Sequence, residues 1–277
     1  MRCTKFAALA FCALSIFLSC VTTGPDGKKS FVLMSDAEEV AIGKDVDADI
    51  RAMNKVYPDT AWARYINEVG QRVVKVCDRQ NIEYHFNVIE SDQINAFATP
   101  GGYVYFYTGI LRMMESESEM AAVMAHEVSH VVARHSAKHL QAALGASIIA
   151  SIALGRHSEE LIGQITGIII GLSLTGYGRS HELEADQFGL VYMTRAGYNP
   201  GGARSMFAKL AELSGGKGGV FEKLTSSHPD TQERIAKIDA QIAAMPRTVD
   251  GLPDHKKRYE VLRKRLPPPA PADSTKK

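Results

Sequence analysis

Two histidines and a glutamate stand at a spacing that can bind a metal ion. The run His126-Glu127-Val128-Ser129-His130 puts two imidazoles four residues apart, on one face of a helix. Two ring nitrogens at that spacing can hold one Zn²⁺. Glu127 follows about 100° further round the helix, where its carboxylate can take a proton from the attacking water. The pattern predicts a zinc ion held by His126 and His130, with Glu127 as the general base.

A third protein ligand is expected further along the chain, because catalytic zinc has three protein ligands and an open fourth position. Glu182 and Asp186 are four residues apart and share one helical face. One carboxylate could complete the ligand set while the other orients a ligand imidazole. The two acids could equally be the solvated start of a helix, where acidic residues are favoured, and the spacing alone does not decide. Glu184 falls on another face.

Two further histidines, His135 and His139, follow in what the sequence predicts to be the same helix. If that helix continues, His135 lies roughly 180° round from His126 and cannot share its metal. With Arg134 and Lys138, these histidines are typical of cations near a helix C-terminus. We therefore interpret them as having no part in the metal site.

The elements that must position these residues are mostly helical. Alternating residues predict a strand from Ile82 to Ile89, a short extended piece at Asn95–Ala98 and a strand from Tyr103 to Tyr107. We expect these to form a sheet of three or four antiparallel strands linked by hairpins. Periodic apolar residues and caps predict helices over residues 35–53, 58–77, 116–138, 180–196, 201–213 and 230–244. The fold class is therefore α+β, mainly α.

The N-terminus has the pattern of an export signal. Residues 1–19 combine Arg2 and Lys5 with an apolar run that is too short to span a bilayer, as in a signal peptide. The ending Phe17-Leu18-Ser19-Cys20 resembles a bacterial lipobox, with Phe17 where Leu is usual, and predicts lipidation of Cys20. The alternative is an ordinary or uncleaved signal with an incidental cysteine.

The remaining boundaries follow from composition. We expect a tether over 20–34, a catalytic domain over 35–250 with an apolar helical insertion at 140–177, and a basic, Pro-rich, solvated tail over 251–277. The apolar runs 142–154 and 161–175 are shorter than the ~20 residues that a membrane helix needs. They favour a helical hairpin that covers the active-site cleft, where it could touch lipid, over a pair of membrane-spanning helices.

Composition excludes several classes of protein. The 277 residues are 45% hydrophobic with a formal net charge of +1, which excludes a disordered chain and argues against a dedicated nucleic-acid binder. Of the four cysteines, two belong to the signal and Cys20 would carry lipid, which leaves Cys77 without a disulfide partner.

The two motifs together resemble a known family. His126–His130 followed by the run Arg179–Asp186 is similar to the HtpX and CaaX-prenyl-protease family of zinc endopeptidases, which are gluzincins, with Gly178 where that family has Ser. The resemblance implies a zincin-like domain with one Zn²⁺ per chain. It also implies His126, His130 and Glu182 as zinc ligands, Glu127 as general base and Asp186 behind the ligands.

Two other segments match the same family. Asn95, Ala96 and Phe97 resemble the edge strand that faces the cleft and pairs with substrate backbone. Ser227-His228-Pro229 with Arg234 resembles an element near the active site, which implies catalytic roles for His228 and Arg234. There His228 would bind the developing oxyanion or occupy the open zinc position in a resting state. The alternatives are a packing histidine before Pro229 and a surface arginine.

The layout is closest to the periplasmic LoiP- and BepA-like members, without the TPR region of the BepA-like ones. The resemblance implies a lipid-anchored metalloendopeptidase that faces the periplasm and cuts misassembled envelope proteins. Val21 after Cys20 favours the outer membrane. The alternatives are an integral-membrane HtpX-like protease and a non-enzymatic chaperone or binding module that keeps the zinc fold. Prenyl-protein processing is disfavoured, because the exported domain shows no spanning helices.

Overall fold

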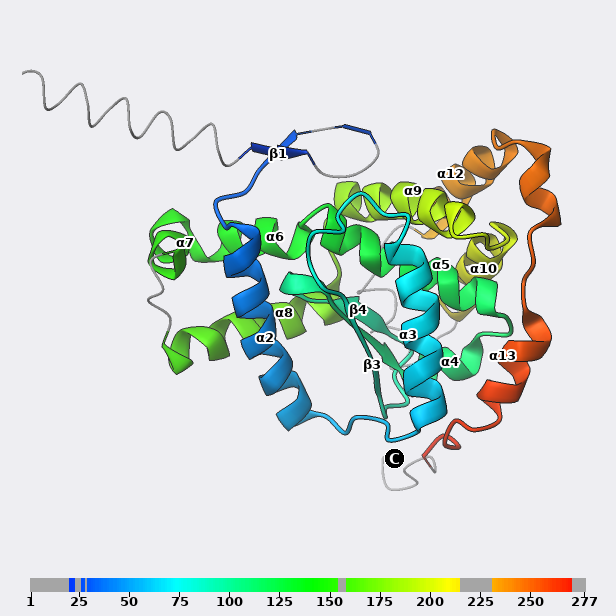
Figure 1. Ribbon diagram of the computed structural model, residues 1–277, viewed down its shortest axis with the longest axis horizontal. Coiled ribbons are helices and arrows are strands. Elements are labelled where there is room, and N and C mark those ends of the chain that lie inside the picture. Colours follow the sequence, from blue (N-terminus) through cyan, green and yellow to red (C-terminus); the bar gives the residue numbers. More distant parts are fainter. Residues whose placement is uncertain (1–19, 23–25, 28, 154–157, 215–230, 271–277) are drawn as a thin grey trace, which may run out of the picture.

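The computed structural model describes residues 20–22, 26–27, 29–153, 158–214 and 231–270 (Figure 1). Two strands, β1 (Cys20–Thr22) and β2 (Lys29–Phe31), precede a body made of three strands surrounded by helices. The strands of the body are β3 (His85–Ile89), β4 (Ala96–Ala98) and β5 (Tyr103–Tyr107). The helices are α2 (Asp36–Met53), α3 (Thr60–Val74), α4 (Thr108–Met113), α5 (Glu117–Val132), α6 (His135–Leu144), α7 (Ala146–Ala153), α8 (Glu159–Thr175), α9 (Arg179–Arg195), α10 (Gly201–Ser214), α12 (Thr231–Ala243) and α13 (Lys256–Arg263). Short 3₁₀ helices cover Pro100–Gly102 and Arg247–Gly251. The expected α+β, mainly helical class is confirmed.

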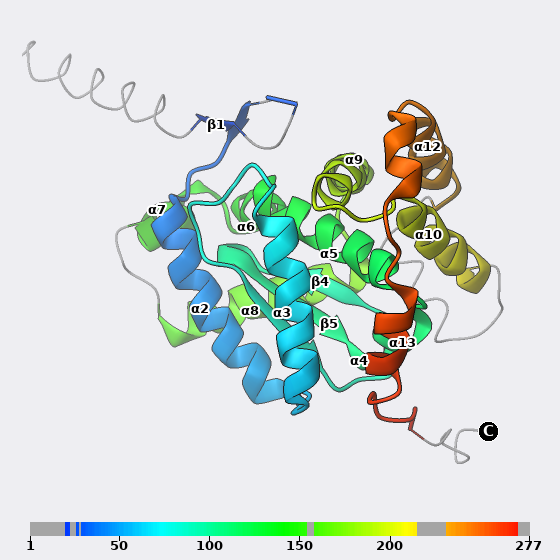
Figure 2. The ribbon, with the colours of Figure 1, turned by 45° about the vertical axis from the view of Figure 1, so that its right-hand side comes forward.

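The sheet separates two hydrophobic cores. Val104 and Phe106 of β5 point into the larger core, to which α3 and α5 also contribute. Tyr84, Phe86 and Val88, which alternation along the predicted strand 82–89 places on one face, are buried in the same core. Tyr103 and Tyr105 point the opposite way, into a second core with α2 and α8. Side chains alternate between the two faces of a strand, and helices cover both faces of β5 (Figure 2). All five residues of β5 are therefore buried.

The strand order is β3-β5-β4. The sheet is mixed, whereas the sequence predicts antiparallel strands throughout. β4 and β5 form the expected antiparallel pair, but β3 runs parallel to β5, with His85 opposite Tyr103. The chain reverses at each end of β4, and β5 then enters between the two earlier strands. Two reversals make β5 parallel to β3, which no local pattern in the sequence records. β4 is left as an edge strand among the described residues.

Helix α3 illustrates why the helices form where they do. Asp59 caps its N-terminus, accepting hydrogen bonds from the amides of Ala61 and Trp62 at 2.8 and 3.0 Å. The side chains that recur at helical spacing are all buried against the sheet and α5: Trp62, Tyr65, Ile66, Val69 and Val73. The predicted periodicity of this helix is therefore confirmed, although the helix ends at Val74, three residues before Cys77.

Helices α5 and α9 pack closely along the larger core. A methyl group added at Gly189 of α9 would lie 3.0 Å from the backbone nitrogen of His126 in α5. Glycine at this position therefore lets the two backbones approach, and brings the side chains of α9 within reach of those on α5.

The segment expected as an apolar insertion packs on the second core. Ile165 and Ile169 of α8 are buried there with α2, and Thr166 donates a hydrogen bond to Asp49 at 2.8 Å. The glycines of the apolar run, Gly163 and Gly167, face open space instead of a neighbouring helix. In the described part of the chain no single helix is long and apolar enough to cross a membrane. Among these residues, α8 and α9 reach the required length and hydropathy only when taken together, and the two helices meet at a 77° bend.

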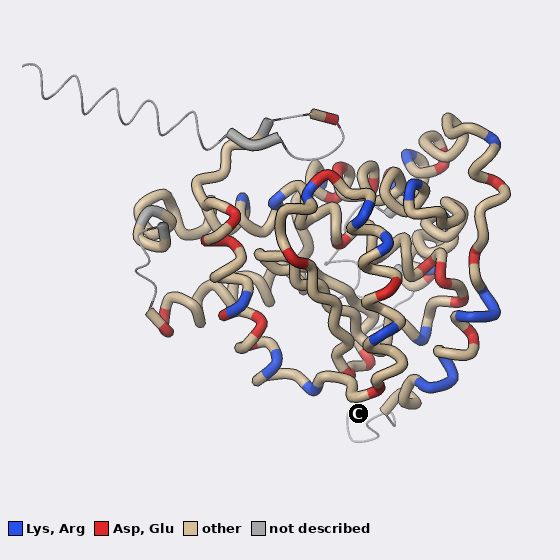
Figure 3. Tube along the Cα trace, viewed as in Figure 1, with Lys and Arg blue, Asp and Glu red and all other residues tan. Residues whose placement is uncertain are grey.

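Both ends of the described chain are tied to the body more firmly than a tether and a solvated tail would be. Val32 and Met34 are buried in the second core. At the other end Tyr259 of α13 is fully buried and donates a hydrogen bond to the carbonyl of Leu111 at 2.7 Å. Basic side chains lie along α13 near the C-terminus (Figure 3). The packed domain therefore extends at least from Val32 to Leu266, which is itself buried.

Candidate metal centre

Helix α5 brings the two histidines and Glu127 together. Ser116 caps the helix, accepting a hydrogen bond from the amide of Glu119 at 3.1 Å, and every residue from Met120 to Ala122 and from Met124 to Val132 is buried. The Nε2 atoms of His126 and His130 are 3.0 Å apart. One helical turn thus aims two ring nitrogens at one point, as the spacing predicts.

Glu182 of α9 supplies a carboxylate at the same point. Its oxygens lie 3.6 Å from Nε2 of His126 and 3.8 Å from Nε2 of His130. The three ligand atoms all fall within 4.8 Å of one another. Two imidazole nitrogens and one carboxylate oxygen are a donor set of catalytic zinc sites, so the residues present fit this ion. The alternative of Glu182 as a solvated helix start is excluded, since its side chain is buried.

Asp186 and Arg234 stand behind the ligands. An oxygen of Asp186 lies 2.9 Å from Nδ1 of His126, the nitrogen on the far side of the ring from the metal position. Arg234 of α12 donates two hydrogen bonds to Asp186, at 2.6 and 2.7 Å, and also lies 3.2 Å from Glu182. Arg234 is buried rather than on the surface. Its guanidinium lies over the ring of Phe207, 4.6 Å from the centroid, and its ion pairs hold the two carboxylates in place.

The carboxylates make this a site for positive charge. Burial opposes protonation of His126, but Asp186 and Glu182 outweigh it and raise the pKa of the imidazole to about 10. Burial likewise opposes ionisation of Asp186, yet the Arg234 guanidinium holds the pKa of that carboxyl below its usual value. The Glu182 carboxylate thus lies where the ligand atoms meet and the Asp186 carboxylate lies behind the His126 ring, and both favour a cation at this point.

The position of His135 differs from the sequence expectation. The helix does not continue to residue 138 as predicted: α5 ends at Val132, Arg134 takes the left-handed conformation with φ 56°, and α6 begins at His135. The break turns the ring of His135 back toward α5, where its Nδ1 lies 2.9 Å from Nδ1 of His130. Burial lowers its pKa to about 4, so His135 is a neutral buried ring and not a cation at a helix end.

Sequence reasoning did not identify two further residues, Glu184 and Tyr177, that contact His135 and His130. Glu184 lies 2.8 Å from Nε2 of His135, so the acid on the other face of α9 also belongs to the site. Tyr177 stacks on His130 with ring centroids 4.1 Å apart, and its hydroxyl lies 2.6 Å from that of Ser136. The spacing correctly places Glu184 on another face of α9, but nothing in the sequence indicates a histidine ring beside that face.

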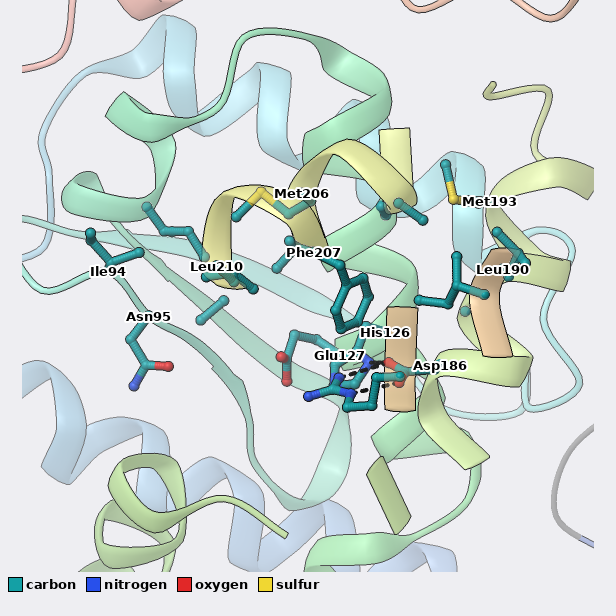
Figure 4. A pocket seen from close by; sticks show the side chains of 18 residues that line it. Ile94, Asn95, His126, Glu127, Asp186, Leu190, Met193, Met206, Phe207 and Leu210 are labelled. Atoms are coloured by element: carbon teal, nitrogen blue, oxygen red, sulfur yellow. Dashed lines mark hydrogen bonds and ion pairs between the residues drawn. The ribbon is translucent and has the colours of Figure 1, made fainter. Parts of the chain in front are cut away.

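A cavity opens beside the general-base candidate. His126 and Glu127 point into it from α5, with Asp186 beside them, and apolar side chains of α9 and α10 form the opposite wall (Figure 4). The wall includes Leu190, Met193, Met206, Phe207 and Leu210. The lining is mostly apolar, with its charged and imidazole groups at the end where the metal ligands lie, as in a site that binds an apolar side chain next to a reacting bond.

The edge strand borders the same cavity in part. Asn95 and Ala96 line it, and the Asn95 amide donates to the carbonyl of Ser173 in α8 at 2.8 Å. Phe97 points to the other face of the sheet, where it stacks on Tyr105 with centroids 4.8 Å apart. Any contact of Phe97 with a bound chain would therefore be through its backbone. His228 lies outside the described residues.

The fold and the donor set together define a zincin-like metallopeptidase. The sequence model of Peptidase family M48 matches residues 61–242, which contain every described residue of the site. The chain belongs to peptidase family M48, and this confirms the metalloendopeptidase family that the motifs indicate.

Proteins with similar sequences are likewise named as proteases. The chain is 33% identical to mitochondrial metalloendopeptidase OMA1 of Schizosaccharomyces pombe over 190 residues, 68% of this chain and 55% of that protein. It is 29% identical to the beta-barrel assembly-enhancing protease of Escherichia coli K12, over 79% of this chain and 47% of that protein. It is 28% identical to metalloprotease YcaL of the same bacterium, over 81% of this chain and 87% of that protein. The chain thus spans about half the length of the first two relatives.

Proposed function

We propose that this chain is a zinc-dependent metalloendopeptidase, with one Zn²⁺ per chain, that hydrolyses peptide bonds in proteins of the bacterial cell envelope. The observation that supports it best is the convergence of His126, His130 and Glu182 beside Glu127, at the polar end of an apolar cavity. His126, His130 and Glu182 would hold the zinc. When bound, zinc lowers the pKa of water and polarises the scissile carbonyl.

The side chains around the metal position have separate tasks. Glu127, on the cavity side of α5, accepts a proton from the attacking water and delivers it to the leaving amine. Asp186 fixes the ring of His126 through Nδ1, and Arg234 keeps both carboxylates in place. His228 would donate to the developing oxyanion, or rest in the open fourth position, as the family resemblance implies.

The edge strand would hold the substrate in an extended conformation. β4 pairs with β5 along one side, and its other side can pair with the backbone of an added chain. Asn95 and Ala96 then lie where that chain meets the cavity. Backbone pairing requires an unfolded segment rather than a particular sequence, which suits a protease that removes misassembled proteins.

Hydrolysis of an unfolded protein tests this proposal. The purified chain is expected to digest casein, to lose that activity when a chelator removes the metal, and to regain it on adding Zn²⁺ back, because the attacking water depends on the ion. The measurement is the release of casein fragments over time. Chelator-resistant digestion, or casein bound but never cut, would contradict the proposal, and the second result would favour a binding module.

Anchoring in the envelope is a separate part of the proposal. The run Phe17-Leu18-Ser19-Cys20 supports export and lipidation of Cys20, and Val21 supports the outer membrane. Residues 1–19 lie outside the described part of the chain. A Cys20→Ala chain expressed in a Gram-negative bacterium is expected to move from the membrane fraction to the soluble periplasm and to lose radiolabelled palmitate. Retention of Cys20→Ala in carbonate-washed membranes would instead support a spanning protein.

A further inference from the structure

The second nitrogen of the ligand His130 faces another histidine. Nε2 of His130 is directed at His126 and Glu182, which leaves Nδ1 on the opposite side of the ring. There it lies 2.9 Å from Nδ1 of His135, whose side chain is completely buried. Two imidazole nitrogens at that distance share one proton, and the direction of the bond decides whether His130 can bind a metal.

Glu184 determines that direction. Its carboxylate lies 2.8 Å from Nε2 of His135, and a carboxylate accepts hydrogen bonds. A proton on Nε2 of His135 makes this hydrogen bond and leaves its Nδ1 as the acceptor that faces His130. Nδ1 of His130 must then be the donor. Nε2 of His130 is left without a proton, which is the form that binds a metal ion.

We propose that His135 and Glu184 are positioning residues that keep the proton of His130 on Nδ1 and its Nε2 ready to bind the metal. This rests on the proposed zinc site. Carboxylates commonly act on a ligand histidine directly, as Asp186 does on His126. At His130 the carboxylate acts through an intervening imidazole, because Glu184 is on the far side of α9 from Glu182 and Asp186.

The break between α5 and α6 makes the arrangement possible. A continuous helix would place His135 on the side away from the metal. Arg134 holds the left-handed turn, donating to Glu39 at 2.8 Å and to the carbonyl of Met34 at 2.6 Å. Arg79 donates to the carbonyl of Val131 at 2.9 Å, in the last turn of α5. This buried ion network at the start of α2 therefore sets the orientation of His135.

The ring of His135 is also held by stacking. His181 lies parallel to it, with centroids 4.1 Å apart. A phenylalanine at position 135 would keep the ring and this stacking but lose both nitrogens. An asparagine would lose the ring but keep an oxygen acceptor at the position of Nδ1. The two substitutions thus separate packing from hydrogen bonding.

Zinc affinity of the full chain, measured by competition with a chromophoric chelator, tests the proposal. We expect His135→Phe to weaken Zn²⁺ binding roughly 10–100-fold, as loss of an outer partner of a ligand histidine does, and His135→Asn to stay close to wild type. The absorption spectrum of the Co²⁺-substituted protein should change in His135→Phe and be preserved in His135→Asn. His139→Phe, one turn further along α6, is the matched control and should bind like wild type.

A second pair of variants keeps the test decisive if the buried His135→Phe change prevents folding. Glu184 is 18% exposed, so it can be replaced with little effect on the core. Glu184→Leu should weaken Zn²⁺ binding, whereas Glu184→Gln, which can still accept from His135, should retain most of it. Wild-type affinity in His135→Phe or Glu184→Leu, or weaker binding in His135→Asn than in His135→Phe, would overturn the proposal. Failure of the wild-type chain to bind Zn²⁺ would instead refute the proposed function.

Discussion

A Glu127→Gln chain is expected to bind zinc as wild type does and to cut casein at least about 10²–10⁴ times more slowly, the range that a general base contributes. Glutamine has the shape of glutamate but cannot accept a proton at neutral pH. Glu127 is on the cavity side of α5 and is 3% exposed, so an isosteric change there should leave the packing of α5 intact.

The control for this variant is its metal content, measured by inductively coupled plasma mass spectrometry on the same sample as the casein assay. Unchanged zinc with lost hydrolysis assigns the proton transfer to Glu127. A Glu127→Gln protein that digests casein at the wild-type rate would mean that another group accepts the proton, and the proposed mechanism would be wrong.

Replacing Glu182 with alanine should remove the metal itself. Glu182 is the residue that α9 contributes to the cluster with His126 and His130, and its buried oxygens are 3.6 and 3.8 Å from the two ligand nitrogens. We expect Zn²⁺ affinity to fall by more than the roughly 10–100-fold that loss of an outer partner causes, because a direct ligand is lost. Hydrolysis should disappear with the metal.

Chelator competition on purified protein measures this loss. Gln187→Ala is the matched control, because Gln187 is on the same helix with an exposed side chain and should bind Zn²⁺ normally. Stoichiometric, tightly held zinc in Glu182→Ala would show that another residue is the third ligand. Asp186 would then be the first candidate, since it is the other buried acid of α9 near His126.

The part of the site that lies on one helical face could be predicted from the sequence. His126, Glu127 and His130 belong to a single turn of α5, and Glu182 and Asp186 to a single turn of α9. Helical periodicity alone fixes which side chains in such a turn point the same way. That the two turns meet depends on packing between α5 and α9, for which only the family resemblance gave a reason.

His135 could not be placed from the sequence, because its position depends on a break in a helix without proline or glycine. Arg134 adopts a left-handed conformation that costs about 1–2 kcal/mol for most residues, and distant partners in α2 stabilise it. Local propensity favours a helix through Arg134. Its ion pair with Glu39, 95 residues earlier, is a tertiary contact that no window of sequence contains.

The mixed sheet and the C-terminal helix show the same limit. Alternation predicts the apolar face of β3 correctly but says nothing of the order in which strands pair. The basic, proline-containing end of the chain has the composition of a solvated tail. Tyr259 nevertheless packs against Trp62 and Tyr65 in the larger core, where two aromatic partners and a hydrogen bond to Leu111 outweigh the surrounding charge.

The central claim is that His126, His130 and Glu182 hold one catalytic zinc ion. Anomalous diffraction from crystals of the zinc-loaded protein, recorded on both sides of the zinc absorption edge, tests it most directly. We predict a single peak about 2.0–2.2 Å from Nε2 of each histidine and from an oxygen of Glu182, with Glu127 near the open side. A zinc peak bound elsewhere, or stoichiometric zinc without Glu182 as a ligand, would contradict the claim.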